Sequence, residues 1–442
     1  MNVLVWPATS EIGREVIRSL QAQRDVHLIL ASNTPVSNDG RRFERIQLPD
    51  VEADPSDAWN TFQLACEHYR IDVVYPCHDV VHAFLANRYR SDEAYAWRMV
   101  GPDASTVQQL RSKSWTAQLL SKDVTVPTAG YNGHGMNSYP RFIKPDVGQG
   151  SRGVYQRIDS VEALHAFRQN VPLTAKHLTL EYLPGKEFTI DCFSSGGRLL
   201  WSMVRERVET RAGISTLTRR VGISTIQDMV LCGLMREWAE RIHHRMRMRG
   251  AWFFQVKLRE SGVPVLLEVA PRIGGGSGLA LANNVNLPML SVLDALDTPR
   301  LTVLDSFFCT QMVRPLGNVY QTAFWDTLVM DIDDTLVVHG HVNTQLMRLV
   351  HQALNDDKIV RFITRDGTQL LSACPDSAFM LKSRIIIVDR EPLAKVEAIR
   401  QLGERPAVFV DDSFTERERV AGLIGIPVFD AAGAECLIKD EL

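Results

Sequence analysis

The stretch from Gln255 to Gly276 carries the residues whose types and spacing point most directly to chemistry. We predict two strands joined by a turn, with Glu268 on the second strand. A glutamate there can bind Mg²⁺, which prefers oxygen ligands, and Gln255 on the facing strand supplies a second oxygen. Arg272 offers a planar fork for a phosphate or a carboxylate, and three glycines follow it. The pattern suits an anion held through a metal, and a salt-bridged loop without a ligand is the alternative.

Two segments upstream carry residues suited to phosphate binding. Lys144 ends a predicted strand, and residues 146–153 follow it with three glycines and a serine. The backbone N–H groups of such a loop can surround phosphate oxygens, but the spacing is not that of a P-loop, and a simple hairpin turn is the alternative. Glu181 interrupts an otherwise apolar strand. A buried carboxylate there needs a partner, and an adenine amino group or a lysine would serve.

A separate set of polar residues lies near the C-terminus. Its carboxylates follow short apolar runs that we predict as strands, a threonine ends another such run, and a lysine opens a helix. These residues are Asp331, Asp333, Thr364, Lys395, Asp411 and Asp412. In an open α/β sheet the carboxyl ends of the strands meet at one edge, where such sheets carry their ligand sites. The pattern therefore predicts a second site, separate from the first.

The length and composition set limits on the whole protein. A chain of 442 residues has room for about three domains. Hydrophobic residues at 45% and charged residues at 23% are typical of a soluble globular protein, and the net charge of −3 argues against general nucleic-acid binding. The seven cysteines are scattered without a CxxC pair, which favours a reducing cytoplasm over a zinc site or disulfides. We expect neither a signal peptide nor a membrane span, because the N-terminus lacks a basic segment and no long apolar run occurs.

Residues 1–112 alternate between predicted strands and helices, which indicates a parallel sheet covered on both faces. The turn after the first strand differs from a dinucleotide-binding fingerprint, because Pro7 stands at the place of the first glycine and only Gly13 remains. We therefore expect a Rossmann-like domain with a structural role or a role on the substrate side.

The remaining boundaries follow from changes in pattern along the chain. The predicted domains are 1–112, 113–305 and 326–442, with a linker over 306–325. Within the second domain, the charged residues 205–207 and 211–213 are expected to be mobile, with a solvated face as the alternative, and the segment from Arg205 to Arg220 is expected to contribute to specificity. The expected fold class is multidomain, α/β and α+β, ending in an α/β domain.

The motifs over roughly residues 1–300, in their order, resemble those of the ATP-grasp superfamily, specifically the carboxylate–amine ligases related to carbamoyl-phosphate synthetase and biotin carboxylase. The first domain takes the place of a pre-ATP-grasp domain and is followed by Lys113. The later motifs are FIKPDVGQGSRGV, LEYLPGKEFTID, FQVKLRE and LLEVAPRIGGGSG. The resemblance implies an ATP-grasp domain and a two-step reaction. A substrate carboxylate attacks the γ-phosphate of ATP, and an amine or another nucleophile then displaces phosphate from the acyl phosphate.

The same resemblance implies roles for individual residues. Those expected to bind the nucleotide are Lys113 and Lys144 at the α- and β-phosphates, Gly148, Gly150, Ser151 and Gly153 over the triphosphate, Glu181, Tyr182 and Leu183 at adenine, and Glu187 at the ribose. Those expected at the reaction centre are Gln255 and Glu268, which bind Mg²⁺ or alternatively Mn²⁺, and Arg272 at the transferred phosphoryl group. Many members of the family carry asparagine two residues after the metal-binding glutamate. Ala270 stands there in this chain, which leaves the number of metal ions open.

Residues 326–442 resemble the haloacid-dehalogenase-like phosphatase superfamily, whose Asp-x-Asp-x-Thr motif is present from Asp331 to Thr335. By that resemblance Asp331 is the nucleophile that forms an aspartyl-phosphate and Asp333 is the general acid/base. Thr364 and Lys395 are expected to hold the phosphate. The residues expected around Mg²⁺ are Asp331, Asp333, Asp411 and Asp412. The short interval between Thr335 and Thr364 implies a minimal cap.

Together these features predict a bifunctional cytoplasmic enzyme. An ADP-forming ligase is joined to a Mg²⁺-dependent phosphatase that acts on a related phosphorylated substrate or product. The expected ligands are ATP, small carboxylates, amines and phosphorylated compounds, without nucleic acid or membrane, and homo-oligomerisation is left open. A small-molecule kinase with an antagonistic phosphatase is one alternative, and it would form a stable phosphorylated product without an amine. A nucleotide-sensing regulatory protein is the other, and it would bind ATP without releasing ADP.

Overall fold

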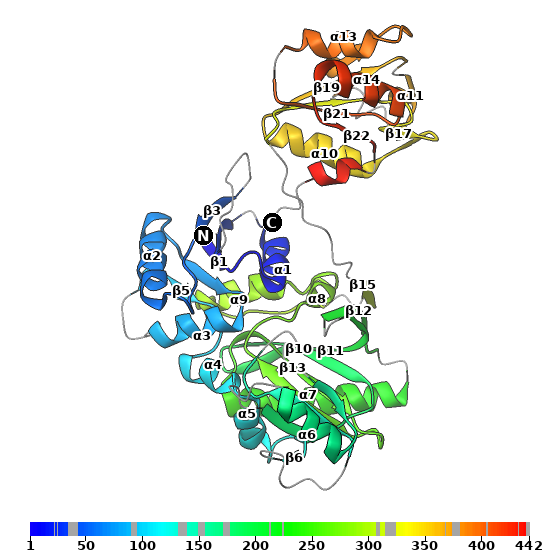
Figure 1. The fold of residues 1–442 in the computed structure, drawn as a ribbon. Coiled ribbons are helices and arrows are strands. Elements are labelled where there is room, and N and C mark those ends of the chain that lie inside the picture. The colour runs from blue at the N-terminus through cyan, green and yellow to red at the C-terminus, as the bar shows by residue number, and fades with distance from the viewer. Residues whose placement is uncertain are drawn as a thin grey trace. The chain divides into compact units, whose positions relative to one another are not determined.

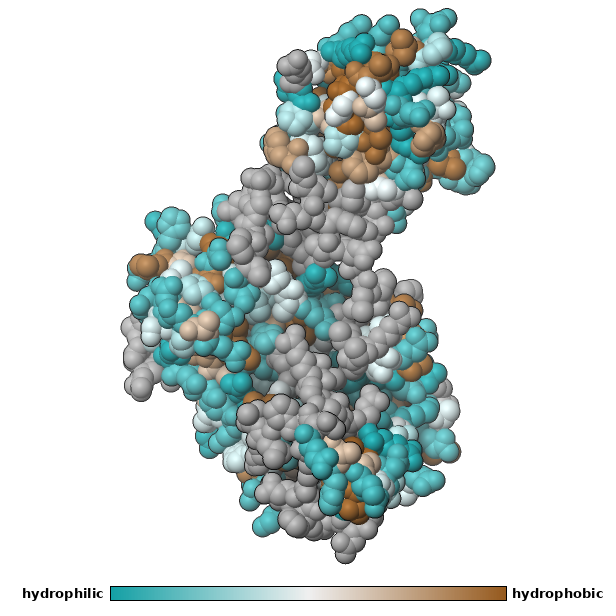
Figure 2. All heavy atoms as spheres, viewed as in Figure 1, coloured by the Kyte–Doolittle hydropathy of each residue, from teal (hydrophilic) through white to brown (hydrophobic). Residues whose placement is uncertain are grey.

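The structure is a computed structural model, and it describes residues 1–438 apart from several short segments. The residues outside the described part are 22, 24, 34–42, 90–94, 131–138, 149–154, 171–176, 212–213, 223–224, 306–309, 314–323, 367, 374–380, 404, 432 and 439–442. The described residues up to 313 form one compact unit, and those from 324 onward form a second. No helix in the described part is long and apolar enough to cross a membrane. Among the coloured residues on the visible face of the first unit, hydrophilic ones predominate and hydrophobic ones occur in small groups (Figure 2).

A five-stranded parallel sheet forms the N-terminal part of the first unit (Figure 1). Its strand order is β3–β2–β1–β4–β5, with β1 (Asn2–Trp6), β2 (His27–Ser32), β3 (Glu44–Gln47), β4 (Val73–Pro76) and β5 (Arg98–Met99). The helices between these strands are α1 (Glu11–Leu20), α2 (Pro55–His68) and α3 (Asp79–Arg88). The parallel sheet predicted for this part of the chain is confirmed.

Helices α1 and α3 begin directly after β1 and β4, at the carboxyl ends of the two strands. The hydroxyl of Ser10 caps α1 by accepting the N–H of Gly13 at 2.9 Å, and the ring of His78 caps α3 by accepting the N–H of Val80 at 3.4 Å. The strand order reverses between β1 and β4. Because ligands of open α/β sheets bind outside the strand ends at such a reversal, the two helix starts border a natural ligand site.

Two antiparallel sheets form the rest of the first unit. The smaller sheet has the order β6–β9–β7–β8, with β6 (Ala129–Gly130), β7 (Arg141–Pro145), β8 (Tyr155–Ile158) and β9 (His177–Glu181). The larger sheet has the order β14–β13–β10–β11–β12–β15, with β10 (Glu187–Ser195), β11 (Arg198–Arg211), β12 (Ile214–Arg220), β13 (Gly250–Leu258), β14 (Pro264–Ala270) and β15 (Gln311–Val313). The hairpin predicted around Gln255 and Glu268 is therefore β13 and β14.

Helix α7 (Ile226–Met246) covers one face of the larger sheet. Trp238 and Ile242 of this helix share a buried cluster with Ile190 and Phe254 of the sheet. Side chains alternate along a strand, so the neighbours of these apolar residues point to the opposite face of the sheet. That opposite face carries polar residues, among them Gln255, and it forms one wall of the cavity described below.

Helix α9 (Leu287–Ala295) ties the two parts of the first unit together, because it contacts both β4 of the parallel sheet and β13 of the larger antiparallel sheet. The other helices of this unit are α4 (Ala104–Leu110), α5 (Lys113–Leu120), α6 (Val161–Asn170) and α8 (Gly278–Leu281). The N-terminal sheet and the antiparallel sheets therefore form one packed body.

The prediction of a charged, mobile segment at residues 205–207 and 211–213 is wrong for the residues of it that the structure describes. These residues belong to the hairpin of β11 and β12. The arginines are neutralised by carboxylates on the neighbouring strand, since Arg205 pairs with Asp191 and Arg207 pairs with Glu187. A charged sequence that would otherwise stay solvated can therefore enter a sheet when each charge meets a partner across the strands.

The stretch 306–325, predicted as a linker, contains folded structure at its described positions. Strand β15 lies beside β12 at the edge of the larger sheet. Trp325 is 4% exposed and belongs to the core of the second unit. Residues 306–309 and 314–323 of this stretch lie outside the described part.

The second unit is a five-stranded parallel sheet with helices on both faces (Figure 1). Its strand order is β20–β19–β16–β21–β22, with β16 (Thr327–Met330), β19 (Ile359–Thr364), β20 (Ile385–Ile387), β21 (Ala407–Val410) and β22 (Val428–Phe429). Leu328 and Met330 pack with α10 (Thr344–Asn355), while Val329 packs with α13 (Ala394–Gln401) and α14 (Phe414–Ile424). Successive residues of β16 thus enter two separate cores, as expected for a central strand buried on both faces.

The remaining elements of the second unit are short. They are β17 (Val337–Val338), β18 (His341–Val342), α11 (Thr368–Ala373) and the 3₁₀ helices η1 (Lys382–Arg384) and η2 (Gly433–Leu437). Residues 331–358 are all described, and they form only the small β17–β18 hairpin, its turns and α10 between strands β16 and β19. No larger domain is inserted in that interval.

Candidate functional site

A cavity of about 920 Å³ lies in the first unit, where the three sheets approach one another. Its walls include the starts of α1 and α3, strand β7, the segment after β9, and strands β10, β11, β13 and β14. The polar residues on these walls include Ser10, Glu11, His78, Lys113, Lys144, Glu187, Thr189, Arg205, Gln255, Glu268 and Arg272. Pockets of several hundred Å³ are the usual size for cofactors and other small molecules. The predicted residues from motifs far apart in the sequence therefore meet at one cavity.

One row of polar residues crosses the larger sheet on the wall of the cavity. Arg205 lies opposite Thr189, Thr189 lies opposite Gln255, and Gln255 lies opposite Glu268 in the strand register. Residues directly opposite each other point to the same face of a sheet, and all four line the cavity. The row places the two predicted Mg²⁺ ligands, Gln255 and Glu268, side by side at one end and an arginine at the other.

Two lysines lie near Glu268 at the same end of the cavity. Nζ of Lys144 donates a hydrogen bond to the carbonyl of Leu267 at 3.0 Å, and Nζ of Lys113 donates to the carbonyl of Gly148 at 2.8 Å. Burial lowers the pKa of Lys144 to about 8, and the neighbouring charge of Lys113 adds to this fall while Glu268 opposes it. Two ammonium groups beside oxygen ligands for a metal suit a polyphosphate with its cation.

Glu181 has protein partners that sequence analysis did not anticipate. Its Oε2 accepts from Nε of Arg259 at 2.9 Å, and its Oε1 accepts from Nη2 of Arg259 at 2.7 Å and from the N–H of Thr128 at 2.8 Å. Burial acts to raise the pKa of Glu181, but these hydrogen bonds outweigh it and lower the pKa. The expected adenine or lysine partner is replaced by an arginine. Tyr182 and Leu183 also line the cavity, and their backbone could contact the adenine base in place of the Glu181 carboxylate.

Arg272 forms a partly buried ion pair with Asp79 at the start of α3. Its Nη2 donates to Oδ2 of Asp79 at 2.9 Å, its Nε donates to Oδ1, and its Nη1 donates to the carbonyl of Ile273 at 3.2 Å. Burial would lower the pKa of Arg272, but the charge of Asp79 outweighs burial and raises it above the usual range. A guanidinium has five N–H groups, so two have no partner among the residues that the structure describes and could meet a ligand.

The other predicted nucleotide-binding residues are partly described. Gly148 lines the cavity, as does Glu187, whose carboxylate pairs with Arg207. Those outside the described part are Gly150, Ser151 and Gly153.

Sequence analysis assigned no site role to Asp79 or Asp191, and it included Arg205 only within a segment expected to contribute to specificity. Asp79 and Asp191 hold Arg272 and Arg205, two of the arginines that line the cavity. No local motif marks them. Asp79 begins the helix that follows the apolar strand β4, and this position at a strand end is the one sequence signal that could have identified it. The roles of Asp191 and Arg205 depend on strand pairing that the local pattern does not specify.

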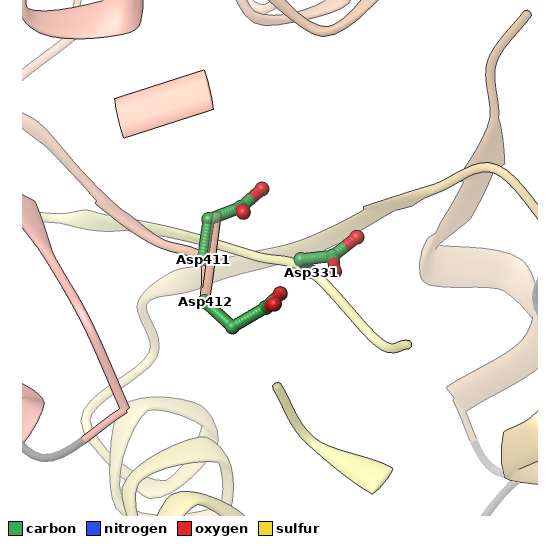
Figure 3. Close-up of side chains that lie close together, drawn as sticks. All are labelled: Asp331, Asp411 and Asp412. Carbon is green, nitrogen blue, oxygen red and sulfur yellow. The ribbon is translucent and has the colours of Figure 1, made fainter. Parts of the chain in front are cut away.

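The second unit brings three carboxylates together at the carboxyl edge of its sheet (Figure 3). Asp331 follows β16, while Asp411 and Asp412 follow the neighbouring strand β21, and one oxygen from each lies within 4.8 Å of the others. Nζ of Lys395 donates to Asp331 at 2.8 Å and to Asp411 at 2.7 Å. One ammonium faces three carboxylates, so the cluster retains negative charge that suits a divalent cation.

Hydroxyl groups complete this second cluster. Thr335 Oγ1 donates to Asp412 at 3.0 Å, and Thr364 Oγ1 donates to Asp333 at 2.6 Å. All predicted residues of the second site are therefore near the same edge of the sheet, but Asp333 lies with Thr364 rather than in the group of three close carboxylates.

Burial raises the pKa of Asp331 to about 7, and the nearby Asp411 and Asp333 carboxylates add to the rise against the charge of Lys395. The two carboxylates that Lys395 contacts raise the pKa of its ammonium, although burial opposes them. The lysine therefore stays charged while one of the carboxylates is prone to hold a proton. A bound cation would offset the repulsion among the carboxylates of the cluster.

Comparison with known proteins gives results for the first unit. A family model for "ATP-grasp in the biosynthetic pathway with Ter operon" matches residues 174–312. The biotin carboxylase domain of Hydrogenobacter thermophilus 2-oxoglutarate carboxylase, solved with MgADP and bicarbonate, has a TM-score of 0.57 and 15% identity over 69% of this chain and 71% of that chain. The L-amino acid ligase from Bacillus licheniformis has a TM-score of 0.52 and 16% identity over 66% and 73% of the two chains. N5-carboxyaminoimidazole ribonucleotide synthetase from Thermotoga maritima has a TM-score of 0.51 and 15% identity over 69% and 78%.

The chain therefore contains an ATP-grasp domain, and the fold predicted from the order of its motifs is confirmed. In fold it is similar to the biotin carboxylase domain and to the L-amino acid ligase. No protein of curated function matches the chain. The family match ends at residue 312, so the second unit is characterised by its own geometry.

We predict that Mg²⁺ stabilises the second unit through its carboxylate cluster. Saturating Mg²⁺ should raise the unfolding temperature of this unit by about 2–8 °C, because a cation that binds only the folded state stabilises it. Asp411→Asn should remove most of that rise. Calorimetry with and without Mg²⁺ measures the shift. Asp357→Asn, at an exposed position of the same unit, is the control and should respond like the wild type. An undiminished shift in Asp411→Asn would contradict the assignment.

Proposed function

We propose that the first unit is an ADP-forming ligase that activates a carboxylate with ATP and passes the acyl group to an amine or a related nucleophile. The observation that carries this proposal is the pair Gln255 and Glu268 beside Lys113 and Lys144 in one cavity of an ATP-grasp domain. The fold is shared with a carboxylase domain solved with MgADP and bicarbonate and with an L-amino acid ligase. ATP with Mg²⁺ is therefore the proposed ligand of the cavity, and Mn²⁺ could replace Mg²⁺.

The proposed arrangement follows the chemistry of the cavity walls. Gln255 and Glu268 would hold Mg²⁺, whose charge would offset that of the phosphates. The two lysines would bind the α- and β-phosphates, with Gly148 beside them. The glycine-rich residues outside the described part remain expected at the triphosphate, namely Gly150, Ser151 and Gly153. The ribose would approach Glu187, and adenine would meet the backbone after β9.

Arg272 is proposed to stabilise charge on the transferred phosphoryl group. Its ion pair with Asp79 fixes the plane of the guanidinium before any ligand binds, so little side-chain freedom is lost on binding. The two N–H groups that remain can donate to phosphate oxygens. Positioning and charge neutralisation are the main protein contributions to phosphoryl transfer.

In the first step, a carboxylate oxygen of the substrate attacks the γ-phosphorus, and the bond from phosphorus to the oxygen of ADP breaks. In the second step, the nucleophile attacks the acyl carbon, and inorganic phosphate leaves with that oxygen. In the kinase alternative, the reaction ends with a stable phosphorylated product. In the sensing alternative, ATP binds and no phosphoryl group is transferred. Ala270 removes one oxygen ligand and keeps the sensing alternative open, which is why product formation has to be measured.

Hydroxylamine should trap the acyl phosphate of the proposed ligase. With MgATP, hydroxylamine and a panel of carboxylic acids that includes the amino acids, the wild type should release ADP and form a hydroxamate with at least one acid. Glu268→Gln should lower that rate by about 100-fold or more. The substitution removes the carboxylate proposed to hold Mg²⁺, and the charge of the phosphates is then no longer neutralised. Mass spectrometry identifies the hydroxamate.

Glu260→Gln is the matched control, since Glu260 is exposed at the turn of the same hairpin. Its rate should equal that of the wild type. ADP release with no hydroxamate from any acid would refute the ligase, and a stable phosphorylated product in its place would favour the kinase.

We propose that the second unit is a Mg²⁺-dependent phosphatase of the haloacid-dehalogenase-like type. The supporting observation is Lys395 between Asp331 and Asp411, with Asp412 close enough to share a cation. In this mechanism an oxygen of Asp331 attacks phosphorus, and Asp333 protonates the departing alcohol. Water then hydrolyses the aspartyl-phosphate and restores Asp331.

The small hairpin between β16 and β19 leaves this second site without a large inserted cap, which suits a bulky phosphorylated compound. A ligase and a phosphatase in one chain fit a single pathway, and we propose that the phosphatase acts on a related substrate or product. Thr364 and Lys395 would hold the phosphate of that compound. A soluble enzyme of the cytoplasm is the proposed context, and the oligomeric state stays open.

Asp331→Asn should abolish phosphate release from a generic aryl phosphate while leaving ADP formation by the first unit unchanged. The substitution removes the nucleophile, so the loss should be about 1,000-fold or more. The adjacent Asp334→Asn is the control, because Asp334 is exposed and has a positive φ of 58° that asparagine tolerates. Undiminished hydrolysis in Asp331→Asn would exclude it as nucleophile.

The affinity of the first unit for MgADP should fall as the pH rises through about 8. The pKa of Lys144 is lowered to about 8, so its ammonium is lost above that pH together with its attraction for phosphate. The fall should reach about tenfold per pH unit at most, because one proton is involved. Lys144→Arg stays charged and should flatten the dependence. Calorimetric titration at a series of pH values measures the affinities, and an identical slope in Lys144→Arg would contradict the assignment.

A further inference from the structure

Arg205 stands at the far end of the polar row from Glu268, and neither the motifs nor the proposed nucleotide site uses it. Its side chain is 3% exposed, and it pairs with Asp191, whose side chain is 1% exposed. Nε of Arg205 donates to Oδ2 of Asp191 at 2.6 Å, and Nη2 donates to Oδ1 at 3.3 Å. Removing a charged pair from water is costly unless the geometry compensates, so its position on a cavity wall calls for a functional reason.

The glycine-rich loop after β14 is shaped around this arginine. A Cβ on Gly274 would lie 2.9 Å from Nη2 of Arg205, and a Cβ on Gly276 would overlap Nη1 and the central guanidinium carbon. Sequence analysis interpreted these glycines as bare backbone for an anionic ligand. In the structure, two of them make room for a guanidinium that can contact the anion instead.

The guanidinium of Arg205 is fixed in position and keeps N–H groups that can donate to a ligand. Its Nη1 has no hydrogen-bond partner among the residues that the structure describes. The side chain nevertheless lines the cavity. The ion pair on one side and the loop on the other fix the plane of the fork, so an anion binds it without ordering a free side chain. The part of the guanidinium that Asp191 leaves unbonded carries only N–H donors, which suits a carboxylate.

We infer that Arg205 binds the carboxylate of the acid that the first unit activates, and that Asp191 positions it. This inference rests on the proposed ligase function. Glu268 with the lysines serves the metal and the phosphates, and Asp79 already engages Arg272. Of the other arginines that line the cavity, Arg272 is assigned to the transferred phosphoryl group, and Arg207 pairs with Glu187 at the proposed ribose position. Arg157 pairs with Asp159, and its side chain is 54% exposed. Arg205 is therefore the buried cavity arginine that we assign to the acid, and the shape of the cavity beside it selects which acid enters.

The test uses the full chain and the acid from the panel that gives the most hydroxamate. Arg205→Lys keeps the charge beside Asp191 but loses the planar fork, and it should raise KM for the acid about tenfold or more. KM for ATP should change less than about twofold, because the nucleotide residues are untouched. Arg205→Gln should raise KM for the acid further. Asp191→Asn should raise it in the same direction, since the fork loses its anchor.

Arg220→Lys is the matched control. Arg220 lies on the neighbouring strand β12 and forms a similar buried pair with Asp305. Arg220 is not among the residues that line this cavity. The Arg220→Lys variant should lose stability, as Arg205→Lys does, but it should keep the wild-type KM for the acid. If Arg205→Gln fails to fold, the KM values of Arg205→Lys decide the question.

The possible results distinguish the role inferred for Arg205 from the proposed ligase function on which it rests. An unchanged KM for the acid in Arg205→Lys overturns the inference while the ligase stands. A parallel rise in KM for ATP overturns it too, because the arginine would then serve the nucleotide. If the wild type forms no hydroxamate with any acid, the ligase proposal itself fails, and the inference fails with it.

Discussion

The partly buried ion pair between Arg272 and Asp79 is the contact on which the site of the first unit depends. It joins the loop that leaves β14 to the start of α3, and so it fixes the larger antiparallel sheet against the N-terminal parallel sheet. Removing one partner would leave the other charge partly buried without its counter-ion and would weaken the packing between the two sheets. The N-terminal sheet is therefore part of the site, and its strand ends form one wall of the cavity.

Pairing with carboxylates is how the first unit neutralises several arginines in and beside its sheets. Arg205 and Arg207 on β11 are fixed by acids of β10, while Arg259 is fixed by Glu181 at the end of β9. The second unit reverses this balance, since one lysine faces three carboxylates. The first arrangement presents fixed N–H donors to an anion, and the second leaves a deficit of positive charge that a metal ion can fill.

The sequence predicts the parts of the fold that depend on local pattern. Apolar runs and motif order were sufficient for the strands around Glu268 and for the ATP-grasp fold, because strand periodicity is local. The charge partners could not be predicted in this way. Asp79 and Arg272 are 193 positions apart, and Glu181 meets Arg259 at a separation of 78, so their contacts exist only once the sheets have assembled. The hairpin that carries Arg205 was missed for the same reason, since its neutralising acids lie on neighbouring strands.

The central claim is that the first unit activates a carboxylate as an acyl phosphate, and the path of the carboxylate oxygen tests it most directly. An acid labelled with heavy oxygen in its carboxylate is supplied with MgATP and an acceptor, and the inorganic phosphate is analysed by mass spectrometry. Attack of the carboxylate on phosphorus followed by attack of the acceptor on carbon predicts phosphate that carries one labelled oxygen. Unlabelled phosphate formed alongside the coupled product would contradict the account.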